Sequence, residues 1–394
     1  MRLKCSMCLM IRYGWICGST IITNSKKKFY IQKQNCNNIE MALTTPSGKL
    51  IPELQFKAHH FIDKTTVLYG PSKTGKTVYV KHIMKILQPH IEQILVVAPS
   101  EPSNRSYEGF VHPTLIHYRL WLADKQKKND NKGAERFLEA IWQRQTMMSS
   151  IYSRVNNIDM LKTLYHKLPI DIQQKENKNI AKVECLKAEQ TDQKKEEKIT
   201  SLYQQLLKKI IIQNIHMYKN LSLTEDEKFT LNYINLNPRL LLILDDCAAE
   251  LHPLFTKEIF KKFFYQNRHC FISMIICCQD DTDLPANLRK NAFVSIFTNA
   301  SICMSNFSRQ SNRYSKQDKE YVEEISHIVF KGYRKLVYIR EDEYRQHFYH
   351  STVPLPTAFS FGSKALLKLC KAVYSKEVVI DKSNPYWSKF RLNF

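Results

Sequence analysis

The sequence predicts an α/β fold with a mainly parallel sheet and a long helical insertion. Short, wholly apolar segments alternate with stretches of helical periodicity, which is typical of parallel sheets covered by helices. The glycine pattern GxxxxGK[ST] follows the first apolar segment directly. A long, charged stretch with helical patterning then separates the first half of the alternating pattern from the second.

These observations divide the 394 residues into parts. We expect an N-terminal extension at 1–40, the first part of the core at 41–119, a charged helical insertion at 120–229, the second part of the core at 230–350 and a C-terminal tail at 351–394. Met41 opens the stretch MALTTPSGKLIPELQF, which resembles an ordinary protein start. We therefore interpret residues 1–40 as an appended extension, and whether they are expressed stays open.

The composition narrows the class of protein. A hydrophobic fraction of 43% excludes a wholly disordered chain, and no uncharged apolar run reaches 18 residues, so no transmembrane segment is expected. The net charge of +22 favours a polyanionic partner such as DNA, with basicity for solubility as the plainer alternative. The irregular spacing of the eleven cysteines does not indicate a disulfide framework, and Cys5 and Cys8 lack the second pair of a zinc site.

In the first part of the core, β-branched and aromatic residues predict a buried strand at 65–69. Residues 77–87 follow with apolar side chains on one helical face, and residues 93–98 form a second apolar strand. The order strand, loop, helix, strand is the beginning of a parallel sheet.

The insertion and the second part of the core follow the same reasoning. Residues 172–200 are dense in Lys, Glu and Gln, which favours a solvated helical excursion or link; the alternative is a lobe that meets DNA or a neighbouring subunit. Later strands are expected at 240–244, 271–278 and 293–298, helices at 255–264 and 318–330, and a closing hairpin at 335–340 and 345–349.

The glycine pattern predicts a phosphate-binding loop, also called a Walker A motif. Its residues are Gly70, Pro71, Ser72, Lys73, Thr74, Gly75, Lys76 and Thr77. Glycines let backbone amides converge on a phosphate chain, Lys76 supplies a cation, and the Thr77 hydroxyl can ligate Mg2+. A small-molecule kinase is a remote alternative, since no acceptor-site motif accompanies the loop. We expect ATP and Mg2+ to bind here.

Polar residues follow two later apolar strands. Asp245 follows the strand at 240–244 and is expected to bind the magnesium. Asp246, one residue on, points differently and is the candidate base for an attacking water. Gln279 follows the strand at 271–278, where its amide could sense a terminal phosphate. Arg289 is the candidate that reaches a phosphate on an adjacent subunit. The plainer alternatives are a turn for the aspartates, a surface amide for Gln279, and a solvated or DNA-facing side chain for Arg289.

In combination and order, these motifs resemble one clan of proteins. The loop, the apolar strand ending in two aspartates, and the segments RHCFISMIICCQ and LPANLRKNAFVSIF resemble the FtsK/HerA clan of P-loop motor ATPases. The likeness is strongest to the genome-packaging ATPases of nucleocytoplasmic large DNA viruses, over 60–110 and 235–350. Asp246 departs from the clan's commoner Glu, so a shorter side chain has to reach the water.

The resemblance implies a RecA-like (ASCE) core with an extra strand between the two nucleotide motifs. It further implies a homo-oligomeric ring that hydrolyses ATP and moves double-stranded DNA into a capsid. Viral capsid or portal components would be partners, and the host cytoplasm and the virion the locations. A DNA helicase or another DNA-processing motor of the clan stays open as an alternative, as does an ATP-dependent DNA- or capsid-binding switch that does no mechanical work.

Overall fold

The computed structural model describes residues 9–11, 14–16, 43–118, 133–188, 193–340 and 347–375. The chain divides into two compact units, Met1–Ala42 and Leu43–Phe394. In the first unit, β1 (Leu9–Ile11) pairs antiparallel with β2 (Gly14–Ile16). All the elements below belong to the second unit.

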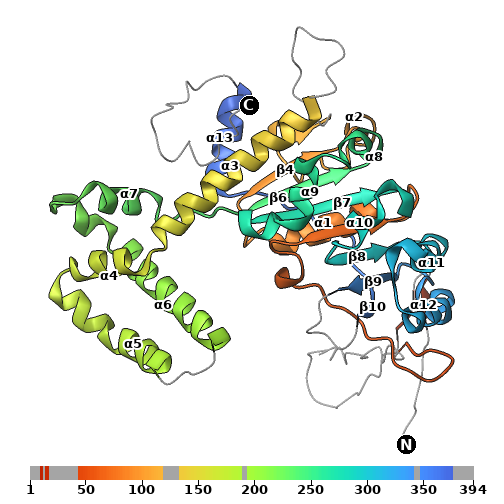
Figure 1. The fold of residues 1–394 in the computed structure, drawn as a ribbon, viewed down its shortest axis with the longest axis horizontal. Helices are drawn as coiled ribbons and strands as arrows, with labels where there is room; N and C mark the ends of the chain where they lie inside the picture. The colour runs from red at the N-terminus through yellow and green to blue at the C-terminus, as the bar shows by residue number, and fades with distance from the viewer. Residues whose placement is uncertain are drawn as a thin grey trace, which may run out of the picture. The chain divides into compact units, whose positions relative to one another are not determined.

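Among the described residues of the second unit, eight strands form one sheet (Figure 1). In spatial order they are β10 (Phe348–Ser351), β9 (Lys335–Ile339), β8 (Val294–Phe297), β3 (Thr65–Tyr69), β7 (Ile272–Cys278), β6 (Leu240–Asp245), β4 (Gln93–Val97) and β5 (Ile116–His117). The strands from β8 to β5 are parallel, and β9 and β10 are antiparallel. The expected α/β class is confirmed, and β7 is the extra strand between β3 and β6.

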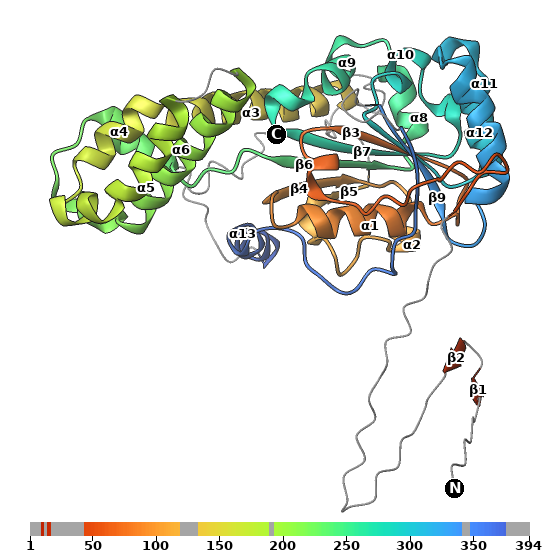
Figure 2. The ribbon, with the colours of Figure 1, turned by 90° about the horizontal axis from the view of Figure 1, so that it is seen from below.

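The central strands are buried on both faces, which explains their continuous apolar runs. Successive side chains of a strand point to opposite faces. In β6, Leu240, Leu242 and Leu244 therefore pack into one hydrophobic core, and Leu241 and Ile243 into the other. In Figure 2, α1 (Lys76–Leu87) covers one face of the sheet, whereas α9 (Glu258–Tyr265), α11 (Ala300–Ser308) and α12 (Lys316–Val329) lie on the other.

The remaining helices of the core are short, except for α12 (14 residues) and α13 (12 residues). They are α2 (Glu101–Asn104), α8 (Ala248–Leu251), α9 (Glu258–Tyr265), α10 (Ala286–Arg289), α11 (Ala300–Ser308), α12 (Lys316–Val329) and α13 (Lys364–Ser375). The predicted helices at 255–264 and 318–330 correspond to α9 and α12. The predicted hairpin corresponds to β9 and β10, with its connection at 341–346 outside the described residues. The short strand β5 and helices α11 and α13 were not predicted.

The inserted segment is helical and has a core of its own. Its helices are α3 (Gly133–Val155), α4 (Ile158–His166), α5 (Ile170–Ala188), α6 (Gln193–Gln213) and α7 (Glu225–Tyr233). The first half of α3 packs on the sheet through Phe137, Leu138 and Ile141. A third hydrophobic cluster, which we call the lobe core, contains buried residues between Val155 and Ile234 and shares none of them with the two cores of the sheet.

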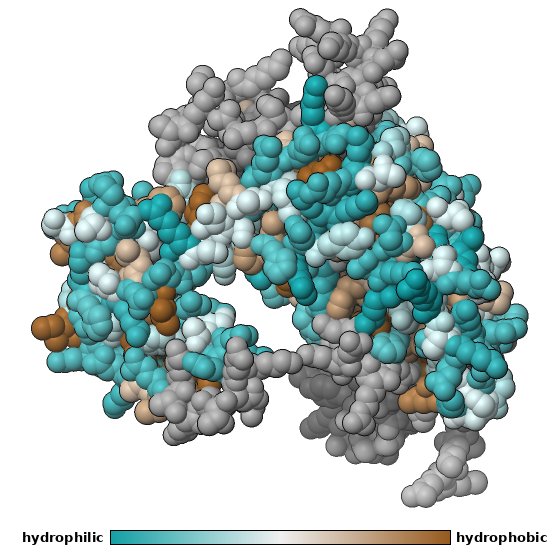
Figure 3. All heavy atoms as spheres, viewed as in Figure 1, coloured by the Kyte–Doolittle hydropathy of each residue, from teal (hydrophilic) through white to brown (hydrophobic). Residues whose placement is uncertain are grey.

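The surface of the inserted helices is mostly hydrophilic, with scattered apolar side chains (Figure 3). The exposed apolar residues of this segment include Ile170, Leu186, Leu202 and Ile215. Within the described residues, no helix combines the length and the apolar character needed to cross a bilayer. The CxxC pair Cys5 and Cys8 lies outside the described part of the chain.

Candidate functional site

The site forms where three neighbouring parallel strands end at one edge of the sheet. Tyr69, the last residue of β3, pairs with Cys278, and Asp245 at the end of β6 pairs with Cys277. The Gly70 amide donates to the Cys278 carbonyl at 3.1 Å, which ties the start of the loop to the end of β7. Strands in a sheet lie about 4.8 Å apart, so Asp245 and the loop are roughly two strand spacings from each other.

The structure explains why both positions of the loop are occupied by glycine. A Cβ on Gly70 would lie 1.7 Å from the Thr298 hydroxyl oxygen, so no larger residue fits there. Gly75 has φ +93° where α1 begins, a left-handed conformation that side chains rarely adopt. The loop therefore needs glycine at its start for space and at its end for backbone freedom.

The remaining loop residues surround the lysine. The Lys76 ammonium donates to the carbonyls of Gly70 and Pro71, the second at 3.0 Å. The Thr74 hydroxyl donates to the Pro71 carbonyl at 2.8 Å and shares a 2.6 Å hydrogen bond with Thr298. Thr77 follows in the first turn of α1. Pro71, Ser72 and Lys73 are exposed at the outside of the loop.

Asp245 is a buried carboxylate, with 7% of its surface exposed. The Tyr107 hydroxyl donates to its Oδ2 atom at 2.8 Å. Burial raises the pKa of Asp245 above its ordinary value. The Tyr107 hydrogen bond, the Cys277 thiol and the charge of Lys76 oppose that rise in pKa. Lys76 begins the helix after the β3 loop, and Asp245 ends β6, which is separated from β3 by β7 alone. The fold thus brings together two motifs that have 168 positions between them in the chain.

Asp246 and Gln279 face each other across the ends of β6 and β7. The Gln279 side-chain amide donates to Asp246 Oδ1 at 2.5 Å, and both residues are exposed. Asp246 has φ +59°, so its side chain leaves the strand in a different direction from that of Asp245. The Gln279 backbone amide donates to Asp283 Oδ2 at 2.7 Å, which anchors the turn. The structure thus joins the candidate base to the candidate sensor.

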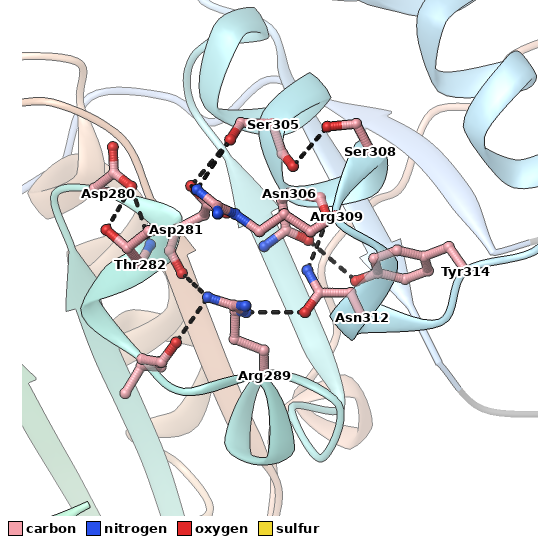
Figure 4. A network of polar contacts seen from close by, with 11 residues as sticks. Asp280, Asp281, Thr282, Arg289, Ser305, Asn306, Ser308, Arg309, Asn312 and Tyr314 are labelled. Atoms are coloured by element: carbon pink, nitrogen blue, oxygen red, sulfur yellow. Dashed lines mark hydrogen bonds and ion pairs between the residues drawn. The ribbon is translucent and has the colours of Figure 1, made fainter.

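Arg289 lies in the interior, within a network of polar contacts (Figure 4). Its guanidinium donates to the carbonyls of Asp281 and Leu284 and, at 3.0 Å, to Asn312 Oδ1. A guanidinium that reaches a phosphate on a neighbouring subunit has to be exposed, so this buried placement does not favour the role expected of Arg289. Arg289 instead holds α10 against its own chain. The second arginine of the network, Arg309, is partly exposed and forms an ion pair with the buried Asp281.

Two residues of the site were missed from the sequence. Thr298 directly follows β8, and its hydroxyl donates to the Tyr69 carbonyl at the end of β3. A polar residue at the end of an apolar strand was the signal that pointed to Asp245 and Gln279, and the same signal could have identified Thr298. Tyr107 lies in a loop without a motif, and no local signal marks it.

The donor set fits a magnesium–nucleotide complex. Within the described residues, no group of three or more His, Cys, Asp or Glu side chains could hold a metal on its own. Mg2+ in nucleotide sites needs less, because one or two protein oxygens act together with phosphate and water ligands. The Thr77 hydroxyl and the Asp245 carboxylate are of this kind, beside a loop whose amides and lysine suit phosphates.

Comparison with known proteins gives very similar relatives and distant structural ones. No family model matches the chain. It is 99% identical over 354 residues to "Uncharacterized protein B354L" from two African swine fever viruses, isolate Tick/Malawi/Lil 20-1/1983 and strain Badajoz 1971 Vero-adapted. The match covers 90% of this chain and all of each relative. Its length equals that of the chain counted from Met41.

The similar solved structures are remote. The genome packaging NTPase B204 from Sulfolobus turreted icosahedral virus 2, in complex with ATP-gammaS, is 15% identical with a TM-score of 0.33, covering 74% of this chain and 98% of that one. The bacterial conjugative coupling protein TrwBdeltaN70 is 11% identical with a TM-score of 0.33, covering 82% and 91%. Structural similarity at this level does not show what the present chain binds.

Proposed function

The chain belongs to the family of the B354L proteins of African swine fever virus, and we propose that it is an ATP-hydrolysing translocase that packages viral double-stranded DNA into the capsid. One observation carries the ATPase part. Lys76 and Asp245 lie at the same edge of the sheet, and the Gln279 amide donates a hydrogen bond to Asp246. A cation, two carboxylates and a polar amide thus lie at the ends of three neighbouring strands.

Each residue has a role in this proposal. The loop amides and Lys76 would bind the phosphates, and Thr77 and Asp245 would hold Mg2+, which supplies positive charge against the phosphate oxygens. Asp246 accepts a proton from the attacking water. Gln279 holds the Asp246 carboxylate through its amide nitrogen, and its amide oxygen stays available to orient the water.

The translocase part rests on charge and on the resemblance to packaging ATPases. A net charge of +22 favours binding to the phosphates of duplex DNA, which needs no base recognition. Movement along DNA by a ring of copies, and contact with capsid or portal components, extend this proposal. The protein would then act at viral assembly sites in the host cytoplasm and could enter the virion.

ATP turnover with and without linear duplex DNA tests the proposal. We expect DNA to stimulate turnover, and Lys76→Ala or Asp246→Asn to abolish it. Lys85→Ala is the matched control, because Lys85 lies at the far end of the same helix and donates to Thr357. Strong residual turnover in the Lys76 variant would exclude the site.

Two further measurements separate the other functions. Displacement of a labelled strand would indicate a helicase instead of a packaging motor. Hydrolysis limited to a single turnover, with no stimulation by DNA and no multimer, would indicate a switch that does no work.

A further inference from the structure

The segment between β4 and β5 carries a buried acidic residue that shapes its own loop. Glu101 is 5% exposed, and its Oε1 atom accepts hydrogen bonds from the amides of Tyr107 at 2.7 Å and Glu108 at 3.0 Å. One carboxylate oxygen thus connects the beginning of the segment 101–108 to its end. These two hydrogen bonds stabilise the conformation of the loop.

The loop 101–108 positions the Tyr107 side chain beside the candidate nucleotide site. Tyr107 is fully buried, and its hydroxyl donates to Asp245 Oδ2. The contact joins residues 138 positions apart.

The hydrogen bond restricts how the Asp245 carboxylate can rotate. A carboxylate with one oxygen held by a fixed donor keeps its other oxygen in a defined direction. Outer-shell partners of this kind orient metal ligands, and their removal typically reduces metal affinity by about 10- to 100-fold.

We propose that Tyr107, clamped by Glu101, is a positioning residue for magnesium: it orients the Asp245 carboxylate toward the cation of a bound Mg2+–nucleotide complex. The inference rests on the proposed ATPase function and adds to it a residue that does not itself touch the nucleotide. A merely structural role, in which the same bond only ties the loop to β6, predicts that the loop loosens and that the effect of magnesium is unchanged.

Binding of a fluorescent ADP analogue distinguishes the two roles without measuring turnover. The quantity compared is the gain in nucleotide affinity between buffer with EDTA and buffer with saturating Mg2+. In Tyr107→Phe we expect this gain to fall by about tenfold or more, with the affinity in EDTA within about twofold of wild type. An unchanged affinity in EDTA also shows that the phosphate loop is folded.

Tyr218→Phe is the matched control. Tyr218 is also buried, and its hydroxyl donates to the Leu164 carbonyl at 2.8 Å in the lobe core, so the variant loses a similar hydrogen bond far along the chain. Its magnesium gain should equal that of wild type. Glu101→Gln, which keeps the Tyr107 hydroxyl but weakens the clamp, should reduce the gain by a smaller factor.

The outcomes separate this inference from the proposed function. If wild type binds no nucleotide, the proposed function fails and the inference with it. If wild type shows the magnesium gain and Tyr107→Phe retains it in full, the positioning role alone is overturned.

Discussion

His60 shows how burial of a single titratable residue makes stability depend on pH. Its Nδ1 atom accepts a hydrogen bond from the Lys57 amide at 3.1 Å, which requires a neutral ring nitrogen. The adjacent imidazole of His59 lies with its ring centroid 4.1 Å away. Burial, reinforced by neighbouring positive charge, lowers the pKa of His60 from 6.5 to about 4. The two histidines are thus a packed pair.

The lowered pKa predicts a loss of stability in mild acid. Below about pH 6.5 the unfolded chain binds a proton at this position that the folded chain excludes down to about pH 4. The free energy of unfolding therefore falls as the pH falls through this window. In His60→Asn, which keeps an acceptor but does not titrate, urea unfolding at about pH 7 and about pH 5 should show a smaller difference than wild type.

His90→Asn serves as the control, because His90 is exposed. It should keep the pH dependence of wild type. An equal difference in all three proteins would show that other groups cause the acid sensitivity.

At the scale of elements, the polar network around Arg289 connects the turn after β7 with α10 and α11. Asp281 accepts from Arg309 through its carboxylate and from Arg289 through its carbonyl. Asn312 accepts from Arg289 and donates to the Asn306 carbonyl at 2.7 Å. Because the turn also contains Gln279, the network supports the sensor side of the site.

Arg289→Ala should therefore act on stability. It leaves three buried acceptors without their donor, and we expect the free energy of unfolding to fall by about 3 kcal/mol. Lys290→Ala, the next residue, should change it by less than about 0.5 kcal/mol. Urea denaturation measures both.

Mixed subunits test the alternative role of Arg289. If it acted on a neighbour's phosphate, mixing Arg289→Ala with Lys76→Ala subunits would restore ATP turnover at some sites. We expect turnover in the mixture to equal the sum of the separate proteins. Clear restoration would return Arg289 to a role between subunits.

At the scale of the whole molecule, the inserted helices are held together independently of the sheet. The lobe core contains fully buried residues such as Leu161, Leu164 and Leu207, none of which packs in the sheet cores. Helix α3 connects the two regions. Its Gln145 amide donates to the carbonyls of Pro238 and Cys270, at 2.9 and 3.0 Å, at the sheet end.

A cavity in the lobe core should consequently have a local effect. Leu207→Ala is expected to cost about 2–5 kcal/mol of local stability. Hydrogen exchange followed by mass spectrometry should then rise in α4 to α7 and stay unchanged in β3 to β8. Ile243→Ala in β6 is the converse control. Faster exchange throughout the sheet in Leu207→Ala would show that the two regions unfold as one.

The sequence alone predicted much of the core. Continuous apolar runs predicted β3, β6 and β7, and the glycine pattern predicted a loop between β3 and a helix, because both patterns depend on neighbouring residues. That Asp245 and Gln279 lie at the edge where the loop lies follows from the same pattern, because the carboxyl ends of parallel strands meet at one edge. Their roles there stay predictions.

Contacts between distant segments were decided only by the tertiary structure. Tyr107 reaches Asp245 because β4 lies beside β6, and nothing local to Tyr107 encodes that strand order. From the sequence, Arg289 was expected to be exposed, whereas in the fold it is buried and donates to Asn312. Local patterns determine which segments become strands and loops, whereas burial and hydrogen-bond partners depend on how those segments assemble.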